Sequence, residues 1–163
     1  MSPSPAPAVR IVPFEPALRE HFYRLNAQWL ERHFVIEEID RQMLGDPESR
    51  VLAPGGAIFF AMLGEEVIGT CALLREAPGV YELSKMGVDE GYRGYGAGRK
   101  LLDAAIAEFH RCDGTRLFLE SNSMLTTALG MYERAGFVLQ PTIREGSHYA
   151  RADVYMVYEG GAH

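Results

Sequence analysis

The sequence predicts a single α/β domain of the α+β type, in which helices cover both faces of a mixed sheet. Its 163 residues match the length of one domain, and 47% of them are apolar, which is enough to build one core. Apolar residues recur at helical spacing in some segments and form short continuous runs in others. The two kinds of segment alternate without the regular strand–helix–strand repeat of a purely parallel sheet.

The elements are predicted in order along the chain. A short apolar segment predicts the first strand, and the spacing of Leu18, Phe22, Leu25 and Trp29 predicts an amphipathic helix after it. Two apolar runs on either side of Gly64 predict a β-hairpin. The predicted strands are residues 9–13, 57–63, 67–74, 80–88, 115–119, 137–139 and 154–157, and the predicted helices are residues 15–31, 37–44, 96–112 and 123–135.

Glycine and proline residues that commonly end helices support the boundaries of these elements. The second helix is expected to end at the Gly-Asp-Pro turn of residues 45–47, and the fourth at Gly136, where a left-handed residue commonly follows a helix. Residues 1–8 lack the basic start and apolar run of a signal peptide, so we expect a flexible tail there. Residues 160–163 form a second expected tail. The predicted domain therefore spans residues 9–159.

Composition excludes several function classes. The chain carries 22 acidic and 16 basic side chains, a net charge of −6, whereas a general nucleic-acid binder needs a basic surface. No segment approaches the roughly 20 apolar residues of a membrane-spanning helix. The two cysteines cannot form a disulfide framework, and no Cys/His cluster has metal-ligand spacing. We therefore expect a cytoplasmic protein that binds no nucleic acid, membrane or metal.

Glycines cluster where a predicted strand leads into a predicted helix. Five of the 17 glycines fall between Gly87 and Gly98, and glycine permits positive φ and close backbone approach. The first N–H groups of a helix lack internal partners and carry the positive end of its dipole. Arg93, Arg99 and Lys100 add three positive charges, and residues 91–102 contain no acid. The segment therefore predicts a site for phosphate oxygens.

Three common explanations of such a glycine cluster each conflict with a feature of this sequence. They are a P-loop, a dinucleotide fingerprint and a loop without a ligand. A P-loop ends in Gly-Lys-Ser/Thr, but Gly98 is followed by Arg99-Lys100-Leu101. A dinucleotide fingerprint places its glycines directly after the strand, whereas here a polar segment intervenes, although Glu120 supplies an acid at the end of the next strand. A loop without a ligand would place glycines in the first turn of a helix, where each costs about 0.5–1 kcal/mol relative to alanine.

Three segments together resemble one family. Arg93-Gly94-Tyr95-Gly96-Ala97-Gly98 resembles the Arg/Gln-x-x-Gly-x-Gly/Ala signature of the GNAT superfamily, the acetyl-CoA-dependent N-acyltransferases. Residues 82–88 (ELSKMGV) resemble the fourth strand of that family, and residues 128–137 (ALGMYERAGF) resemble its later Ala-x-x-x-Tyr-x-x-x-Gly-Phe helix. The resemblance implies a single-domain fold with a mostly antiparallel central sheet.

The resemblance also implies which residues bind acetyl-CoA, the expected co-substrate. Backbone N–H groups of the glycine-rich loop would hold the pyrophosphate, and the preceding strand would pair with the pantetheine arm. Gly87 would mark a bulge in that strand that aims one N–H at the thioester carbonyl. Asn122 would contact the coenzyme, although helix capping fits this residue equally well. The implied coenzyme residues are Met86, Gly87, Val88, Arg93, Gly94, Tyr95, Gly96, Ala97, Gly98, Arg99 and Asn122.

Catalytic roles follow from the same resemblance. Tyr132 matches the family tyrosine that protonates the departing thiolate, although a half-buried aromatic residue with an unrelated hydrogen bond would fit the sequence too. An alkyl ammonium must lose a proton before it can attack. Glu82 is the candidate base, acting directly or through a water, unless it is an edge-strand carboxylate paired with Lys85. Glu120 could replace it.

The acceptor site is expected to lie between the end of the first helix and the segment of residues 147–151. Carboxylates such as Glu37 and Glu38 would suit a cationic amine, although exposed acids commonly only solubilise a surface. His33 and His148 fall in segments that border the acceptor site in this family, although either could be a solvated loop residue. The candidate acceptor residues are His33, Phe34, Glu37, Glu38, His148 and Tyr149.

We therefore expect an N-acetyltransferase that moves acetyl from acetyl-CoA to a primary amine, with a small molecule as the first choice of acceptor. Direct attack in a ternary complex is expected, because Cys71 and Cys112 lie outside any nucleophile motif and fit as core residues. The alternatives are a non-catalytic module that binds acyl-CoA as a sensor, and an acetyltransferase for protein N-termini or lysines. The sequence is compatible with a homodimer.

Overall fold

The computed structural model of the chain describes residues 8–147 and 149–160. The expected tails at 1–8 and 160–163 fall almost entirely outside this range, as does His148. The described strands are β1 (Arg10–Pro13), β2 (Ala57–Leu63), β3 (Glu66–Ala77), β4 (Val80–Val88), β5 (Arg116–Ser121), β6 (Phe137–Leu139) and β7 (Val154–Tyr158). They form one seven-stranded sheet in the order β1-β2-β3-β4-β5-β7-β6.

The sheet is mixed, but mostly antiparallel. Five of its neighbouring pairs run antiparallel, and only β4 and β5 run parallel. A parallel pair needs a long crossover, which here contains the helix α3 (Ala97–Arg111). The fold class implied by the family resemblance is therefore confirmed.

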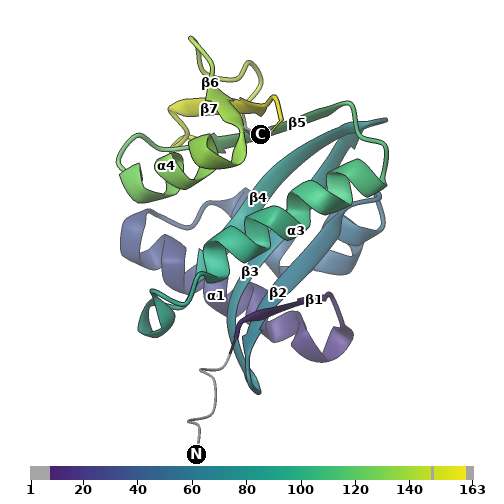
Figure 1. Cartoon of the computed structure of the whole chain (residues 1–163), viewed down its shortest axis with the longest axis vertical. Helices are drawn as coiled ribbons and strands as arrows, with labels where there is room; N and C mark the ends of the chain where they lie inside the picture. Colours follow the sequence, from purple (N-terminus) through teal and green to yellow (C-terminus); the bar gives the residue numbers. More distant parts are fainter. Residues whose placement is uncertain (1–7, 148, 161–163) are drawn as a thin grey trace, which may run out of the picture.

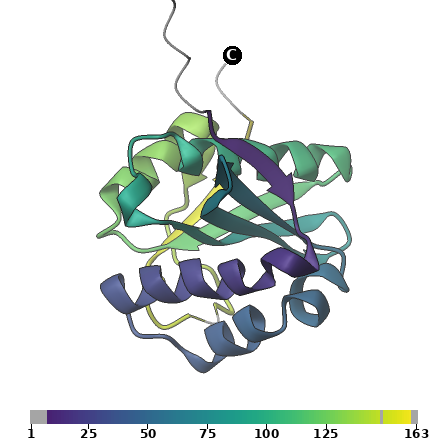
Figure 2. The same cartoon turned by 90° about the horizontal axis from the view of Figure 1, so that it is seen from below.

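Helices cover both faces of this sheet. They are α1 (Arg19–His33), α2 (Glu38–Gly45), α3 (Ala97–Arg111) and α4 (Thr126–Ala135). Figure 1 shows α3 and α4 in front of the strands, and Figure 2 shows α1 and α2 on the opposite face. The prediction of helices on both faces is confirmed.

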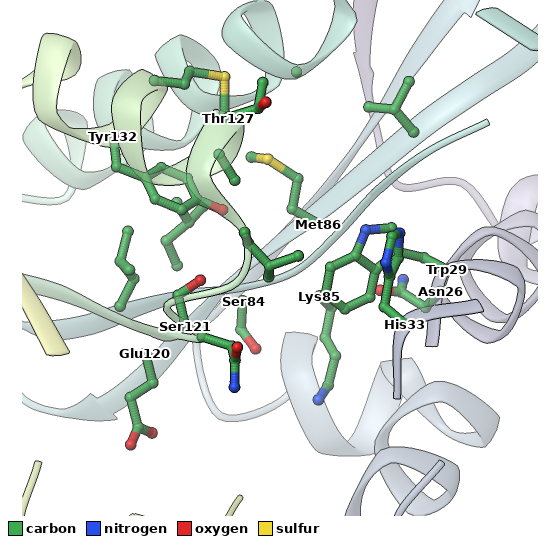
Figure 3. A pocket seen from close by; sticks show the side chains of 18 of the residues that line it. Asn26, Trp29, His33, Ser84, Lys85, Met86, Glu120, Ser121, Thr127 and Tyr132 are labelled. Atoms are coloured by element: carbon green, nitrogen blue, oxygen red, sulfur yellow. The ribbon is translucent and has the colours of Figure 1, made fainter. Parts of the chain in front are cut away.

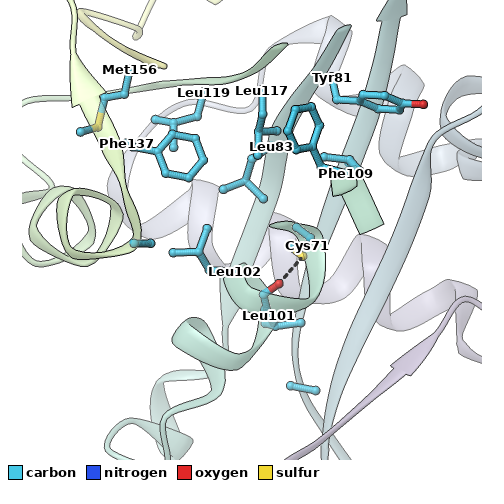
Figure 4. Close-up of a cluster of buried hydrophobic side chains, with 14 of the residues drawn as sticks. Cys71, Tyr81, Leu83, Leu101, Leu102, Phe109, Leu117, Leu119, Phe137 and Met156 are labelled. Atoms are coloured by element: carbon cyan, nitrogen blue, oxygen red, sulfur yellow. Dashed lines mark hydrogen bonds between the residues drawn. The ribbon is translucent and has the colours of Figure 1, made fainter. Parts of the chain in front are cut away.

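Each face has its own core, because side chains alternate along a strand. In β4, Tyr81 and Leu83 pack with α3 in one cluster, whereas Glu82 points to the face covered by α1. The second cluster contains Phe22 of α1 among the fully buried side chains. Figure 4 shows the first cluster, in which the Cys71 thiol donates to the Leu101 carbonyl over 3.6 Å. Burial raises the pKa of Cys71 to about 12, so this thiol is a packing group and stays protonated.

Two helices begin later than the periodicity indicates, and each delay has a local cause. Pro16 starts a separate 3-10 turn, Pro16–Leu18, before α1. Before α4, Asp153 accepts hydrogen bonds from the backbone N–H and the hydroxyl of Ser123, both at 2.8 Å. Asn122 also accepts from the backbone N–H of Met124 at 2.9 Å. These bonds hold a turn where the sequence predicted the first residues of a helix.

Candidate active site

A cavity of about 890 Å³ opens where β4 and β5 diverge. The two strands pair only as far as Leu83 and Leu119, so the edge of β4 beyond Leu83 has no partner in β5. The cavity passes through this gap, and its lining comes from both faces of the sheet. In Figure 3, Tyr132 lies on one side of the strand ends, whereas the side chains of Glu120 and Lys85 point to the other side.

Most of the residues predicted for the site line this one cavity. They are Glu82, Tyr132, Met86, Val88, Arg93, Gly94, Gly96, Ala97, Gly98, Arg99, Asn122, His33, Phe34 and Tyr149. Four predicted residues do not contribute to its lining, namely Gly87, Tyr95, Glu37 and Glu38. His148 lies outside the described residues. The separate segments identified in the sequence therefore converge in space.

The glycine-rich loop forms an open cradle at the beginning of α3. Gly94 and Gly96 have positive φ values of 88° and 80°, a conformation that favours glycine. A Cβ atom at either position would meet nothing within 4 Å, so their backbone faces open space. The unpartnered N–H groups of the first turn of α3 border the same cavity, together with Ala97 and Gly98. These features fit the pyrophosphate of coenzyme A.

The basic side chains around the cradle have acidic partners. Arg93 donates to Glu90 over 2.9 Å, and Arg99 donates to Asp103 over 3.0 Å. Both acids lie just outside the acid-free segment noted in the sequence, so the local positive charge is smaller than that segment indicates. Exposed ion pairs of this kind contribute little energy, so either arginine is able to exchange its partner for a phosphate.

The expected bulge in β4 is present, but Gly87 is not the residue that forms it. The pairing with β3 passes from Ala72–Ser84 to Thr70–Gly87, so Lys85 and Met86 together oppose the single residue Cys71. Lys85 has a φ of 53°, a left-handed conformation that costs a non-glycine residue about 1–3 kcal/mol.

Gly87 itself serves helix packing. A Cβ atom there would lie 3.0 Å from the backbone oxygen of Leu25. The glycine therefore allows α1 to approach β4 closely.

Tyr132 projects from α4 into the cavity. Its ring packs on Phe137 with 6.1 Å between ring centroids. Burial, followed by the neighbouring thiol of Cys71, raises the pKa of its hydroxyl to about 12. The hydroxyl is therefore protonated at neutral pH and can donate a proton inside the cavity.

Three carboxylates and one guanidinium gather on the opposite side of the gap. Glu82 is buried, and its pKa is raised to about 8 by desolvation and by the negative charges of Glu120 and Glu76, against the opposing effect of Arg144. The side chain of Glu120 is 4% exposed, and Arg144 Nη1 lies 3.7 Å from its Oε2. In the described part of the chain, these two atoms are the buried side-chain atoms without a hydrogen-bond partner. The arrangement can take up a proton near neutral pH.

A second charged cluster lies beside the bulge. Lys85 Nζ donates to Asp40 Oδ1 and to the Tyr149 hydroxyl, both over 2.8 Å. Arg151 donates to both oxygens of Asp40, over 2.9 and 3.0 Å, and to Glu37 over 2.9 Å. Burial alone would raise the pKa of Asp40, but the bonds from Arg151 and Lys85 outweigh it and lower that pKa to about 2. The cluster joins α2 to β4 and to the segment before β7.

The expected acceptor carboxylates, Glu37 and Glu38, contact arginines and do not face the large cavity. Glu37 is held by Arg151 and by the backbone N–H of Ala150, over 3.3 Å. The side chain of Glu38 is 71% exposed and lies 3.6 Å from Arg41. Neither glutamate lines the large cavity, where the carboxylates are Glu82 and Glu120.

His33 and Phe34 line the cavity at the end of α1. They pack with Trp29, with 5.2 Å and 5.6 Å between the ring centroids.

The side-chain amide of Asn122 has a structural partner, because its Nδ2 donates to the Arg151 carbonyl over 2.7 Å. Asn122 therefore fastens the end of β5 to the segment that carries Arg151.

Neither Asp40 nor Lys85 was predicted from the sequence as part of the site. The available signal was a lysine inside a predicted strand, because a lysine that becomes buried there needs a partner. Nothing local pairs it with Asp40, which lies 45 residues away.

Two further observations concern the described residues only. No group of three or more His, Cys, Asp or Glu side chains among them is arranged to hold a metal ion. None of their helices has the length and apolar character that crossing a membrane requires.

Comparison with known proteins agrees with this architecture. The acetyltransferase of the GNAT family from Staphylococcus aureus Mu50 superposes with a TM-score of 0.82 at 22% identity, covering 93% of this chain and 98% of that one. An acetyltransferase from Streptococcus agalactiae 2603 gives 0.79 at 22% identity, with coverage of 93% and 98%. The Bacillus subtilis acetyltransferase in complex with CoA gives 0.69 at 19% identity, with coverage of 92% and 97%. These likenesses show a shared fold.

The family assignment comes from the sequence itself. The model of the acetyltransferase (GNAT) family matches residues 13–137, which run from the end of β1 to the beginning of β6. The matched region includes the glycine-rich loop, Glu82 and Tyr132. The chain therefore belongs to the acetyltransferase (GNAT) family.

Proposed function

We propose that this protein transfers the acetyl group of acetyl-CoA to the primary amine of a small molecule, by direct attack in a ternary complex. The observation that carries the proposal is one cavity with a phosphate cradle, a protonated tyrosine on one side of the sheet and buried carboxylates on the other. The CoA complex of the Bacillus subtilis structure with the same fold supports the choice of coenzyme. The buried Cys71 thiol, with its raised pKa, disfavours an acyl-cysteine route.

Each residue of the proposed site has a defined task. The N–H groups of the loop and of the first turn of α3 bind the pyrophosphate, while Met86 and Val88 flank the pantetheine arm. Bound acetyl-CoA supplies the thioester carbonyl, at which a C–N bond forms and a C–S bond breaks. Glu82 accepts the proton of the acceptor ammonium, and Tyr132 donates a proton to the departing sulfur. The products are an amide and the free thiol of coenzyme A.

The shape of the acceptor end supports a small molecule. Trp29, His33 and Phe34 form an aromatic wall there. The bonds from Arg151 to Glu37 and Asp40 connect α2 to the segment before β7, whereas an extended peptide would need an open groove at that point. The cytoplasmic location and the homodimer stay predictions.

A panel of acceptors tests the proposal. Release of the coenzyme A thiol is measured with small primary amines, a peptide with a free N-terminus and a lysine peptide, against the same mixtures without acceptor. At least one small amine is expected to raise release well above the acceptor-free rate. Release with peptides alone would assign the protein to protein acetylation. Tight acetyl-CoA binding without any acceptor-dependent release would identify a non-catalytic module.

The conformation of the glycine-rich loop leads to a separate prediction. Gly96→Val is expected to weaken acetyl-CoA binding by at least about tenfold, because valine opposes the positive φ, at about 1–2 kcal/mol, and places its side chain where the phosphate would lie. Isothermal titration calorimetry with acetyl-CoA measures the effect. Gly64→Val is the matched control, since Gly64 also has a positive φ and open space around its Cβ position but lies in the β2–β3 turn. Equal affinities of the two variants would remove the cradle from the coenzyme site.

A further inference from the structure

We propose that Lys85 is a positioning residue whose buried ion pair with Asp40 holds the β4 bulge in the conformation that turns a backbone N–H toward the acetyl carbonyl. The inference deepens the proposed function and rests on it, because the N–H is useful only where a thioester carbonyl is bound. The family match and the overall fold do not by themselves single out this side chain. The role of Lys85 depends on the backbone of the bulge, the anchoring of the side chain and the position of both in the cavity.

The bulge leaves backbone groups outside the strand ladder where the strand borders the cavity. Lys85 and Met86 oppose one residue of β3, and a bulged residue is left outside the ladder. On the other edge, pairing with β5 has already ended at Leu83. Both Lys85 and Met86 line the cavity, so an N–H of this segment can meet a bound carbonyl oxygen and stabilise the charge that develops on it.

The conformation of the bulge needs support. Among the described residues, only Lys85 and Asp113 are non-glycine residues with positive φ. Asp113 lies in the turn after α3, and aspartate tolerates this conformation through local hydrogen bonds. Lysine has no such local compensation, so the left-handed conformation at Lys85 persists only because the surrounding structure holds it.

Contacts of the Lys85 side chain are part of this support. It is 3% exposed, and its Nζ bonds to Asp40, whose side chain is 0% exposed. Nζ also bonds to the Tyr149 hydroxyl and lies 4.4 Å from the centre of that ring. Asp40 is fixed in turn by Arg151. The charges balance, because Lys85 and Arg151 face Asp40 and Glu37, so the cluster is a rigid anchor for the bulge.

A pair of substitutions separates positioning from direct chemistry. Lys85→Ala and Lys85→Gly both remove the ammonium group, but only alanine opposes a left-handed φ. We expect Lys85→Ala to lower kcat by about 10- to 100-fold, and Lys85→Gly to retain at least about fivefold more activity than Lys85→Ala. KM for the amine and the affinity for coenzyme A should change less than kcat in both variants. Equal losses in the two variants, or a larger loss for glycine, would overturn the proposal.

A spectroscopic measurement tests the same point without an acceptor. The carbonyl stretch of acetyl-CoA labelled with ¹³C at the carbonyl carbon is recorded by infrared difference spectroscopy, free and bound to each variant. A hydrogen bond from the bulge lowers this frequency in the wild-type protein; Lys85→Ala should lose most of the shift, and Lys85→Gly should keep most of it. An unchanged shift in Lys85→Ala would overturn the role of Lys85. Failure of the wild-type protein to bind acetyl-CoA would overturn the proposed function instead.

Discussion

Replacement of Tyr132 by phenylalanine is expected to lower kcat by about 100- to 1000-fold, within the range typical of a lost general acid, with an unchanged dissociation constant for acetyl-CoA. The hydroxyl is protonated because burial raises its pKa to about 12, so it can give its proton to a leaving thiolate. Phenylalanine keeps the packing on Phe137 but has no proton to give. Steady-state kinetics with the best acceptor of the panel, together with calorimetric titration of acetyl-CoA, measure both quantities.

Tyr158→Phe is the matched control for this experiment. The Tyr158 ring also packs on Phe137, with 5.4 Å between ring centroids, but Tyr158 does not line the cavity. Its loss of a hydroxyl should therefore leave kcat within about twofold of the wild-type value, as for most substitutions away from a site. Wild-type turnover in Tyr132→Phe would remove this residue from the role of acid.

The parts of the fold that the sequence predicted depend on local patterns. The hairpin around Gly64 and the helix that ends at Gly136 each follow from residues that are close together in the sequence. Both are present in the structure. The glycine-rich loop is also local, because its glycines and the first turn of α3 are adjacent in the chain. Local periodicity therefore located the elements and the clustered glycines located the cradle, while the mostly antiparallel pairing of the strands came from the resemblance to the family.

The parts that the sequence could not predict depend on contacts between distant segments. Gly87 was expected to mark the bulge, but it makes room for Leu25 of α1, and the bulge falls on Lys85 and Met86. The need of Lys85 for Asp40 arises only when α2 folds against β4. No periodicity encodes such a pairing, because the two residues belong to different elements and each fits its own element without the other.

The raised pKa of Glu82 depends on long-range contacts too. Its neighbours Glu76 and Glu120 belong to β3 and β5, and Arg144 belongs to the segment after β6. In the sequence, Glu82 is simply an acid in a strand. Only the assembled sheet desolvates it and surrounds it with like charge, which makes it suitable as a base near neutral pH.

Glu82→Gln is expected to lower kcat by about 100- to 1000-fold, and the pH profile of the wild-type enzyme should show why. A base with a pKa of about 8 is active only when deprotonated, so kcat should rise with pH and level off above this value. In Glu82→Gln this rise should disappear. Glu120→Gln is the informative companion, because it removes a negative charge beside Glu82 and should shift the rise to lower pH. A rise that survives in Glu82→Gln and vanishes in Glu120→Gln would make Glu120 the base.

Stability should respond to Glu82→Gln in the direction opposite to activity. The pKa of Glu82 is raised in the folded protein above its value in the unfolded chain, so folding favours the protonated carboxyl. Its contribution to stability is therefore fully present below the unfolded pKa and is lost as the pH rises through about 8. Glutamine imitates the neutral carboxyl at every pH, so at pH 9 the variant should melt at a higher temperature than the wild-type protein. At pH 4, below the pKa of the unfolded chain, the two should agree closely. Matching melting temperatures at pH 9 would show that Glu82 titrates normally. A variant that is more stable but inactive would show that the protein gives up stability to keep a base that works near neutral pH.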